Sequence, residues 1–177
     1  MAARRHQLRP DQHRHHLRDR ERHRRHEGRP VKLYDIFFDL TRLEMQLWDQ
    51  VDTALRAATG VPLGRFEALL VLRRLGPSRV QDLSRELSLT VGGTSKLVDR
   101  LEAAGLCTRT ANPADRRSSV ITLTAAAQPL LDTGEAVITS TLETALGAHL
   151  SPDDLTSLAG HLQQLRRAAD GGKAGHA

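Results

Sequence analysis

The stretch that most constrains this chain is residues 90–124, TVGGTSKLVDRLEAAGLCTRTANPADRRSSVITLT. It predicts a helix after Thr90, a stop at Gly105, and then two short β runs around the turn-forming Asn-Pro-Ala-Asp at 112–115. Upstream, residues 79–89 (RVQDLSRELSL) predict a short helix that ends in a turn. This order indicates a winged helix-turn-helix, in which the second helix lies in the DNA major groove and the hairpin tip reaches the minor groove.

Apolar patterning predicts further helices on both sides of this unit. Apolar residues recur at three- and four-residue steps over 33–58 and 63–75. After the hairpin, a long helix is expected over 124–148, with Pro129 in its second turn kinking it or delaying its start. Ser-Pro-Asp at 151–153 opens a last helix. The predicted fold class is mainly α with a small β-hairpin wing (α+β), a winged helix-turn-helix lobe on an all-α base.

These elements set the predicted domain boundaries. Three hydroxyl residues, Ser78, Thr90 and Thr124, are placed to cap the helices that follow them. The chain is predicted to consist of a disordered arm (1–29), a folded domain (30–170) and a frayed tail (171–177). Within the folded domain, the DNA-binding lobe covers 62–124 and the base helices cover 31–58 and 124–170.

The basic charge of the chain is concentrated in the arm. Residues 1–29 hold ten arginines and four acids, so the +5 of the whole chain leaves −1 for the rest. His13, His15 and His16 suggest a metal-binding tract, but the arginines between them oppose a dication and no cysteine or carboxylate cluster accompanies them. We expect instead a solvated basic arm that attracts phosphate without specificity. No metal and no cofactor are predicted.

Several classes of protein are excluded by what the chain lacks. No apolar run approaches the roughly 18–20 residues that span a bilayer, and no apolar stretch follows the first positive charges as in a secretory signal. The single cysteine, Cys107, indicates a reducing cytoplasm, with the protein associated with the nucleoid, and its place at a strand start indicates a structural role. No nucleophile–base pair, phosphate loop or HExxH-type site appears, so we expect no enzyme.

With the wing included, the chain resembles the MarR family of bacterial transcriptional regulators over residues 31–169. The motifs that carry the resemblance are DLSRELSLT, TSKLVDRLEAAGL and ADRRSSVITLT, in this order and spacing. The resemblance implies a homodimer of winged lobes that binds pseudo-palindromic operators in double-stranded DNA, most often as a repressor released by a small ligand. The chain departs from the family at AAAQP after the second strand, where a charged residue and a glycine are frequent.

Leucine stripes on the first and last helices also predict a homodimer, since two-fold symmetry places two DNA-reading helices about one DNA turn apart. A larger monomeric core is the alternative. The family's effectors bind between the base and the winged lobe, which makes Tyr34, Trp48, Arg65 and Phe66 candidate contacts. Aromatic residues at helical spacing also serve the core, and no effector is identified by the sequence.

The family's wing pattern of Asp, any residue, then Arg falls on Asp115 and Arg117. A guanidinium is favoured in a narrow A·T-rich minor groove, and a nearby carboxylate can hold it ready. Arg116 does the same or contacts phosphate. Asp115 is equally well explained as a structural ion-pair partner.

On the second helix of the predicted helix-turn-helix, the family's base-facing stretch falls on residues 92–96. Lys96 can donate to guanine O6 and N7, Ser95 to a base edge or a phosphate, and Arg100 to phosphate. A solvated helix face is the alternative for each. The complete predicted DNA-binding set is Thr90, Gly92, Gly93, Thr94, Ser95, Lys96, Arg100, Arg116 and Arg117.

Two functions therefore remain open. The first is a sequence-specific DNA-binding regulator, and the alternative is a DNA-compacting protein that uses the basic arm with low specificity. A regulator should prefer one palindrome by roughly 10³ or more at physiological salt, and a compacting protein by little.

Overall fold

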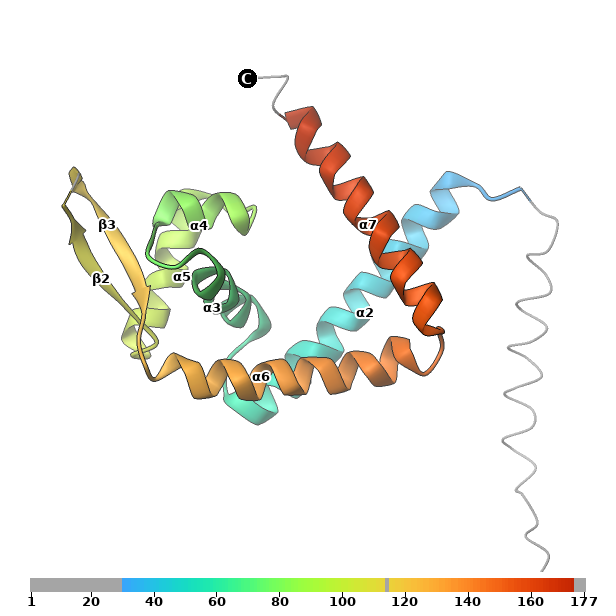
Figure 1. Cartoon of the computed structure of the whole chain (residues 1–177), viewed down its shortest axis with the longest axis horizontal. Coiled ribbons are helices and arrows are strands. Elements are labelled where there is room, and N and C mark those ends of the chain that lie inside the picture. The colour runs from blue at the N-terminus through green and yellow to red at the C-terminus, as the bar shows by residue number, and fades with distance from the viewer. Residues whose placement is uncertain (1–29, 114, 174–177) are drawn as a thin grey trace, which may run out of the picture. The chain divides into compact units, whose positions relative to one another are not determined.

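A computed structural model describes residues 30–113 and 115–173 (Figure 1). The predicted arm at 1–29 and residues 174–177 of the predicted tail lie outside the described residues. The chain divides into two compact units, residues 1–43 and 44–177, which are taken separately below. Helices dominate and one small antiparallel sheet accompanies them, which confirms the predicted fold class.

Helix α2 (Leu33–Thr59) begins in the first unit and continues into the second. In the first unit its apolar side chains lie exposed, with Leu33 at 82% and Phe37 at 62% of full exposure. The rings of Phe37 and Phe38 contact each other edge to face, with centroids 5.4 Å apart. The predicted apolar stripe is therefore present, but within this chain it is buried only farther along, at Val51 and Leu55.

The second unit contains the winged lobe and the last two helices. In Figure 1 the green helices α3 to α5 lie together beside the hairpin, and α6 runs along α3. The three strands form one antiparallel sheet in the order β1-β3-β2. The elements are α3 (Leu63–Leu75), β1 (Ser78–Arg79), α4 (Val80–Glu86), α5 (Val91–Ala103), β2 (Cys107–Asn112), β3 (Asp115–Leu123), α6 (Ala127–Leu142), the π-helical turn η1 (Glu143–Gly147) and α7 (Pro152–Lys173).

One apolar core holds the lobe together. Its largest fully buried side chains come from α2 to α6 and β3, so these helices and the sheet share one interior. Each buried leucine or phenylalanine contributes about 1.5–3 kcal/mol to folding. The fully buried large residues are Leu55, Phe66, Leu69, Leu72, Leu83, Leu101, Ile121 and Leu131.

The ends of α5 follow the sequence prediction. Thr90 Oγ1 accepts a hydrogen bond from Gly93 N at 3.1 Å, which confirms the predicted N-cap. Gly105 has φ +71°, and the N–H of Leu106 reaches back to the carbonyl of Leu101 at 2.9 Å. This is the C-terminal glycine motif that the sequence predicts.

The predicted cap at Ser78 is wrong. Ser78 belongs to β1, pairs with Ile121 of β3, and donates its hydroxyl to Gly76 O at 2.8 Å. The start of α4 is held instead by Asp82, whose carboxylate accepts from Arg79 N at 3.1 Å. Short-range patterning cannot show that a third strand joins the hairpin, and the hydroxyl is used there.

The predicted cap at Thr124 is also wrong. The Thr124 hydroxyl donates to Gly105 O at 2.6 Å and so fastens the end of β3 to the end of α5. Helix α6 begins three residues later, with Pro129 in its first turn. The delayed start is one of the two outcomes that the proline predicts, because a proline has no N–H to donate within a helix.

Gly134 marks a close approach of α6 to the core. A methyl group placed there would lie 2.1 Å from Phe66 Cε2 and 3.0 Å from Leu55 Cδ1. Alanine is favoured over glycine within a helix by about 1 kcal/mol, but overpacking a closed core costs about 1–3 kcal/mol. Because Phe66 is fully buried and cannot swing away, overpacking wins.

We therefore expect Gly134→Ala to lower the free energy of unfolding by about 1–2 kcal/mol in urea titrations. Gly64→Ala on α3 is the matched control, because nothing lies within 4 Å of its added methyl group. That variant should be neutral or more stable by up to about 1 kcal/mol. Equal stability of the two variants would show that α6 and Phe66 do not touch.

Candidate nucleic-acid interface

Helices α4 and α5 form a helix-turn-helix. The turn between them contains Ser88, whose φ of +53° is uncommon for a residue other than glycine. The chain is held there by a hydrogen bond from Leu89 N to Ser84 O at 3.0 Å. The turn leads directly into α5, where Gly92 and Gly93 in the first turn and Lys96 in the second are all exposed. The start of α5 is therefore open to a partner.

The inner face of α5 is centred on Val98. Val98, Leu101 and Thr94 are fully buried, whereas Leu97 is half-buried and Ala104 is exposed. Thr94 is fully buried and donates its hydroxyl to Thr90 O at 3.0 Å. Its predicted contact with DNA does not fit this position, so Thr94 is left out of the interface.

Arg109 on β2 braces α5 against the wing. Its Nη2 donates to Ser95 O at 3.0 Å and lies 2.7 Å from Asp99 Oδ1. Its backbone N–H donates to Glu102 Oε1 at 3.1 Å, and the guanidinium Nε lies 3.8 Å from Oε2 of the same carboxylate. One arginine thus contacts three residues on successive turns of α5, namely Ser95, Asp99 and Glu102.

The sequence alone did not single out Arg109 as a site residue. Its partners lie between 7 and 14 residues away, across a turn and a strand, so no helical periodicity connects them. The only signal available was the coincidence of one arginine in the first strand with two acids on the preceding helix.

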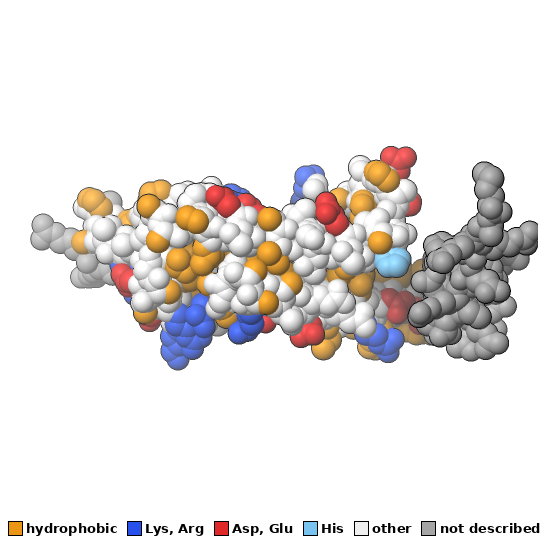
Figure 2. All heavy atoms as spheres, turned by 90° about the horizontal axis from the view of Figure 1, so that it is seen from below, with side chains coloured by type: hydrophobic (Ala, Val, Ile, Leu, Met, Phe, Trp, Pro, Cys, Tyr) orange, Lys and Arg blue, Asp and Glu red, His pale blue; other side chains and the backbone are white. Residues whose placement is uncertain are grey.

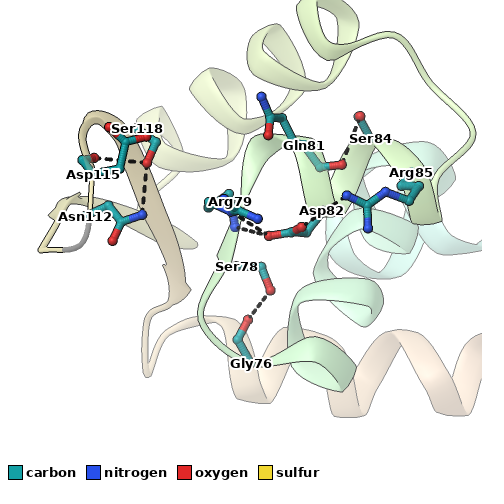
Figure 3. A network of polar contacts seen from close by, with 10 residues as sticks. All are labelled: Gly76, Ser78, Arg79, Gln81, Asp82, Ser84, Arg85, Asn112, Asp115 and Ser118. Atoms are coloured by element: carbon teal, nitrogen blue, oxygen red, sulfur yellow. Dashed lines mark hydrogen bonds and ion pairs between the residues drawn. The ribbon is translucent and has the colours of Figure 1, made fainter.

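The remaining acids of the helix-turn-helix are also paired. Figure 3 shows Arg79 and Arg85 on either side of Asp82, at 3.2 Å and 3.5 Å from its carboxylate oxygens. The hydrogen bond from the Arg79 side chain is the main cause that holds the pKa of Asp82 below its usual value. Glu86 pairs with Arg74 in the same way.

This pairing decides the electrostatics of the surface. Asp82 and Glu86 on α4 pair with arginines, and Asp99 and Glu102 on α5 share Arg109, so these carboxylates repel a phosphate less than their number suggests. Within the described residues, Lys96 and Arg100 are exposed and form no ion pair. Their charge is therefore available to an anionic partner.

The wing is made by β2 and β3 and carries a bulge. The pairing jumps from Ala111–Ser119 to Asn112–Asp115, which leaves residues 116–118 of β3 as the bulge. Asn112 Nδ2 donates to Ser118 Oγ at 2.9 Å, and this hydroxyl donates to Asp115 O at 3.1 Å. Bulges re-aim the side chains of a strand, and both predicted arginines, 116 and 117, fall in this one. Their side chains lie outside the described part of the structure.

The four candidate effector contacts differ in burial. Phe66 is fully buried in the core, Arg65 is half-buried, and Trp48 and Tyr34 are 45% and 54% exposed, the last in the first unit. Cys107 is buried, and burial is the main cause that raises the pKa of its thiol to about 11. A thiol of this kind is a poor nucleophile, which supports the structural role.

Neither a metal cluster nor a membrane helix is found in the described part of the chain. There, His, Cys, Asp and Glu side chains do not gather in threes at distances that could hold a metal. The predicted histidine tract at 13–16 lies outside the described residues. No described helix is both long enough and apolar enough to cross a bilayer.

Comparison with known proteins identifies the family. The MarR family model matches residues 61–119, which run from the start of α3 into the wing. YcgE of Bacillus subtilis (strain 168), named as an uncharacterized HTH-type transcriptional regulator, is 32% identical over 113 residues, which are 59% of this chain and 73% of YcgE. The chain belongs to the MarR family. YfiV of the same organism, named likewise, is 29% identical and covers 62% of this chain and 68% of YfiV.

Solved structures agree on the fold of this MarR-family protein. Sco3205, a MarR family regulator from Streptomyces coelicolor solved with DNA, aligns with TM-score 0.70 and 21% identity over 80% of this chain and 91% of that one. A probable transcriptional regulator from Pseudomonas aeruginosa aligns with TM-score 0.67 and 27% identity over 76% and 99%. These relatives are named as transcriptional regulators and not as enzymes.

The brace at Arg109 should be measurable as stability. Replacing it with glutamine removes charge-assisted bonds, each worth about 1.5–3 kcal/mol, but solvent reaches Asp99 and Glu102 and reduces the loss. We expect Arg109→Gln to lower the free energy of unfolding by about 1–2 kcal/mol in urea. Arg100→Gln, on the exposed face of α5, should stay within about 0.5 kcal/mol of the wild type. Similar values for both variants would remove Arg109 from its bracing role.

Proposed function

We propose that this protein is a transcriptional repressor that binds a pseudo-palindromic operator as a homodimer and is released by a small ligand. The observation that carries the proposal is the first turn of α5, which is exposed and next to a wing while the neighbouring acids are compensated by arginines. Sco3205, a regulator of the same fold whose structure was solved in complex with DNA, supports the proposal that this chain binds DNA.

Each DNA-facing element has its own task in the proposal. The start of α5 enters the major groove, where Lys96 donates to guanine and Ser95 to a base edge or phosphate. Gly92 and Gly93 allow the backbone to approach the DNA closely, because neither carries a side chain. Arg100 contacts phosphate.

The bulged wing aims at the adjacent minor groove. Arg117 is attracted there by a narrow A·T-rich groove, with Asp115 as its positioning partner, and Arg116 contacts the groove or its phosphates. The Ser118 hydroxyl is hydrogen-bonded to Asn112 and to Asp115, which links the two wing strands close to their turn.

Exposed apolar surface supports the dimer. Leu33 and Phe37 in the first unit and Leu158, Leu162 and Leu165 on α7 keep between 36% and 82% of their side-chain surface in solvent. Figure 2 shows apolar side chains exposed between charged ones on one face of the molecule. Soluble monomers rarely leave such helical stripes uncovered, and a second copy of the chain covers them by symmetry.

Release by an effector is the part of the proposal that rests on family membership. Tyr34, Trp48 and Arg65 are the candidate contacts, since they are exposed or half-buried. Phe66 belongs to the core and would at most form the floor of such a site.

Selection of genomic DNA fragments by the purified protein tests the function directly. We expect one palindromic sequence to be bound roughly 10³-fold or more tightly than random duplex at physiological salt.

Lys96→Ala should relax base preference at one position per half-site by about 1–3 kcal/mol, whereas Arg117→Ala should weaken binding chiefly where the flanks are A·T-rich. A flat preference in the wild type would favour the DNA-compacting alternative, and a uniform loss in Lys96→Ala would make Lys96 a phosphate contact.

Sedimentation tests the dimer. We expect the wild type to sediment as a dimer at micromolar concentration and Phe37→Glu to sediment as a monomer, because a buried carboxylate without a partner is strongly unfavourable. Glu44→Gln on the same helix is the control and should leave the dimer intact. A wild-type monomer, or a Phe37→Glu dimer, would show that the stripe of α2 is not the interface.

A further inference from the structure

A small pocket lined by both polar and apolar residues lies where the helix-turn-helix meets the wing. It has a volume of about 190 Å³ and is lined by Arg79, Val80 and Gln81 around the start of α4, Val91 at the start of α5, and Ser118 and Ser119 of β3. None of these six residues is in the predicted DNA-binding set. A pocket of this size is below the roughly 300–1,000 Å³ typical of sites for drug-sized molecules.

The strand pairing fixes how the pocket is built. Arg79 lies opposite Val120 in the β1–β3 ladder, and Ser118 is two residues from Val120 on the same strand. Ser118 and Ser119 are consecutive residues next to the bulge, where the regular alternation of side chains is interrupted, and both line the pocket together with Arg79. Figure 3 shows Arg79 between the wing residue Ser118 and its partner Asp82.

The Arg79 side chain is held in place and still open to solvent. Its Nε donates to Asp82 Oδ2 at 3.2 Å, and the side chain keeps 47% of its surface exposed. A guanidinium fixed along one edge presents its remaining N–H groups in a planar fork, which is the geometry that suits two oxygens of one phosphate.

Docking geometry indicates what fills the pocket. When α5 lies in the major groove and the wing in the adjacent minor groove, the sugar-phosphate strand that separates the two grooves must cross between them. The pocket has α5 at one side, through Val91, and the wing at the other, through Ser118 and Ser119. It therefore lies on the path of that strand.

We propose that this pocket seats one phosphodiester group of the DNA backbone, with Arg79 as the charged donor and Gln81, Ser118 and Ser119 as polar neighbours. This inference rests on the proposed function and adds a phosphate contact that sets how the reading helix and the wing register on the duplex. Such contacts position the protein and carry no base sequence themselves.

The test couples one residue to one phosphate. Operators carrying a single uncharged methylphosphonate at each backbone position in turn are titrated with the full-length wild type and with Arg79→Gln. In the wild type, neutralising the phosphate between the α5 contacts and the wing contacts should weaken binding roughly tenfold. Arg79→Gln should bind about tenfold more weakly to every base sequence and should be insensitive to neutralisation at that one position.

Arg85→Gln is the matched control. Arg85 also pairs with Asp82, and it lies on α4, the helix that Arg79 precedes, but it does not line the pocket. In Arg85→Gln, neutralising the same phosphate should weaken binding as much as in the wild type, whereas in Arg79→Gln it should have no effect. If neutralisation weakens binding in both variants as in the wild type, the proposal is overturned. Arg79→Lys, which retains the charge, should recover part of the affinity and guards against a folding defect in Arg79→Gln.

The salt dependence on random duplex separates this proposal from the proposed function. Arg79→Gln should lower the slope of log affinity against log salt by about 1 on any DNA, operator or random. If the wild type prefers its operator, but Arg79→Gln keeps both the wild-type salt slope and the wild-type sensitivity to the neutralised phosphate, only the phosphate seat is overturned. A slope change without any operator preference overturns the repressor function alone.

Discussion

The guanidinium of Arg109 is the interaction on which the DNA-facing surface depends. It is anchored in β2 and reaches Ser95 O and Asp99 on α5, so the reading helix and the wing move as one body. Thr124 adds a second tie, from the end of β3 to the end of α5. A protein that reads two adjacent grooves needs this rigidity, because a relative shift of the two elements would bring one contact out of register while the other is made.

The same arrangement resolves an apparent conflict in charge. Outside the arm the chain sums to −1, and the helix-turn-helix carries four acids, which is unfavourable for a surface that approaches phosphates. Asp82 and Glu86 pair with arginines, and Asp99 and Glu102 share Arg109. These ion pairs weaken the field of the carboxylates at short range and hold the arginines in defined positions. The acids therefore orient the basic groups, and the depressed pKa of Asp82 reflects this pairing. A local positive surface does not require a basic domain.

Sequence patterning located most of the fold because its signals are local. The bounds of α3, the cap at Thr90 and the glycine stop at Gly105 all depend on residues within a few positions of each other. Ser78 and Thr124 were misjudged because both hydroxyls bond to groups that tertiary structure alone brings near. For the same reason Arg109 and Arg79 were missed as site residues: each acts through a partner or pocket on another element, and neither periodicity nor a motif connects them.

Stability is distributed unevenly along α5, and this unevenness matches the proposed contacts. Two glycines in the first turn cost about 1 kcal/mol each relative to alanine, and the Thr90 cap returns only about 1 kcal/mol. Farther along, Val98 and Leu101 are fully buried and Arg109 fastens the exposed side. The helix thus has a firm body and a marginal first turn. Because the first turn is where bases would be read, DNA that fits it stabilises the helix further, whereas DNA that does not fit leaves the glycine cost uncompensated. This difference adds to the discrimination supplied by Lys96 itself.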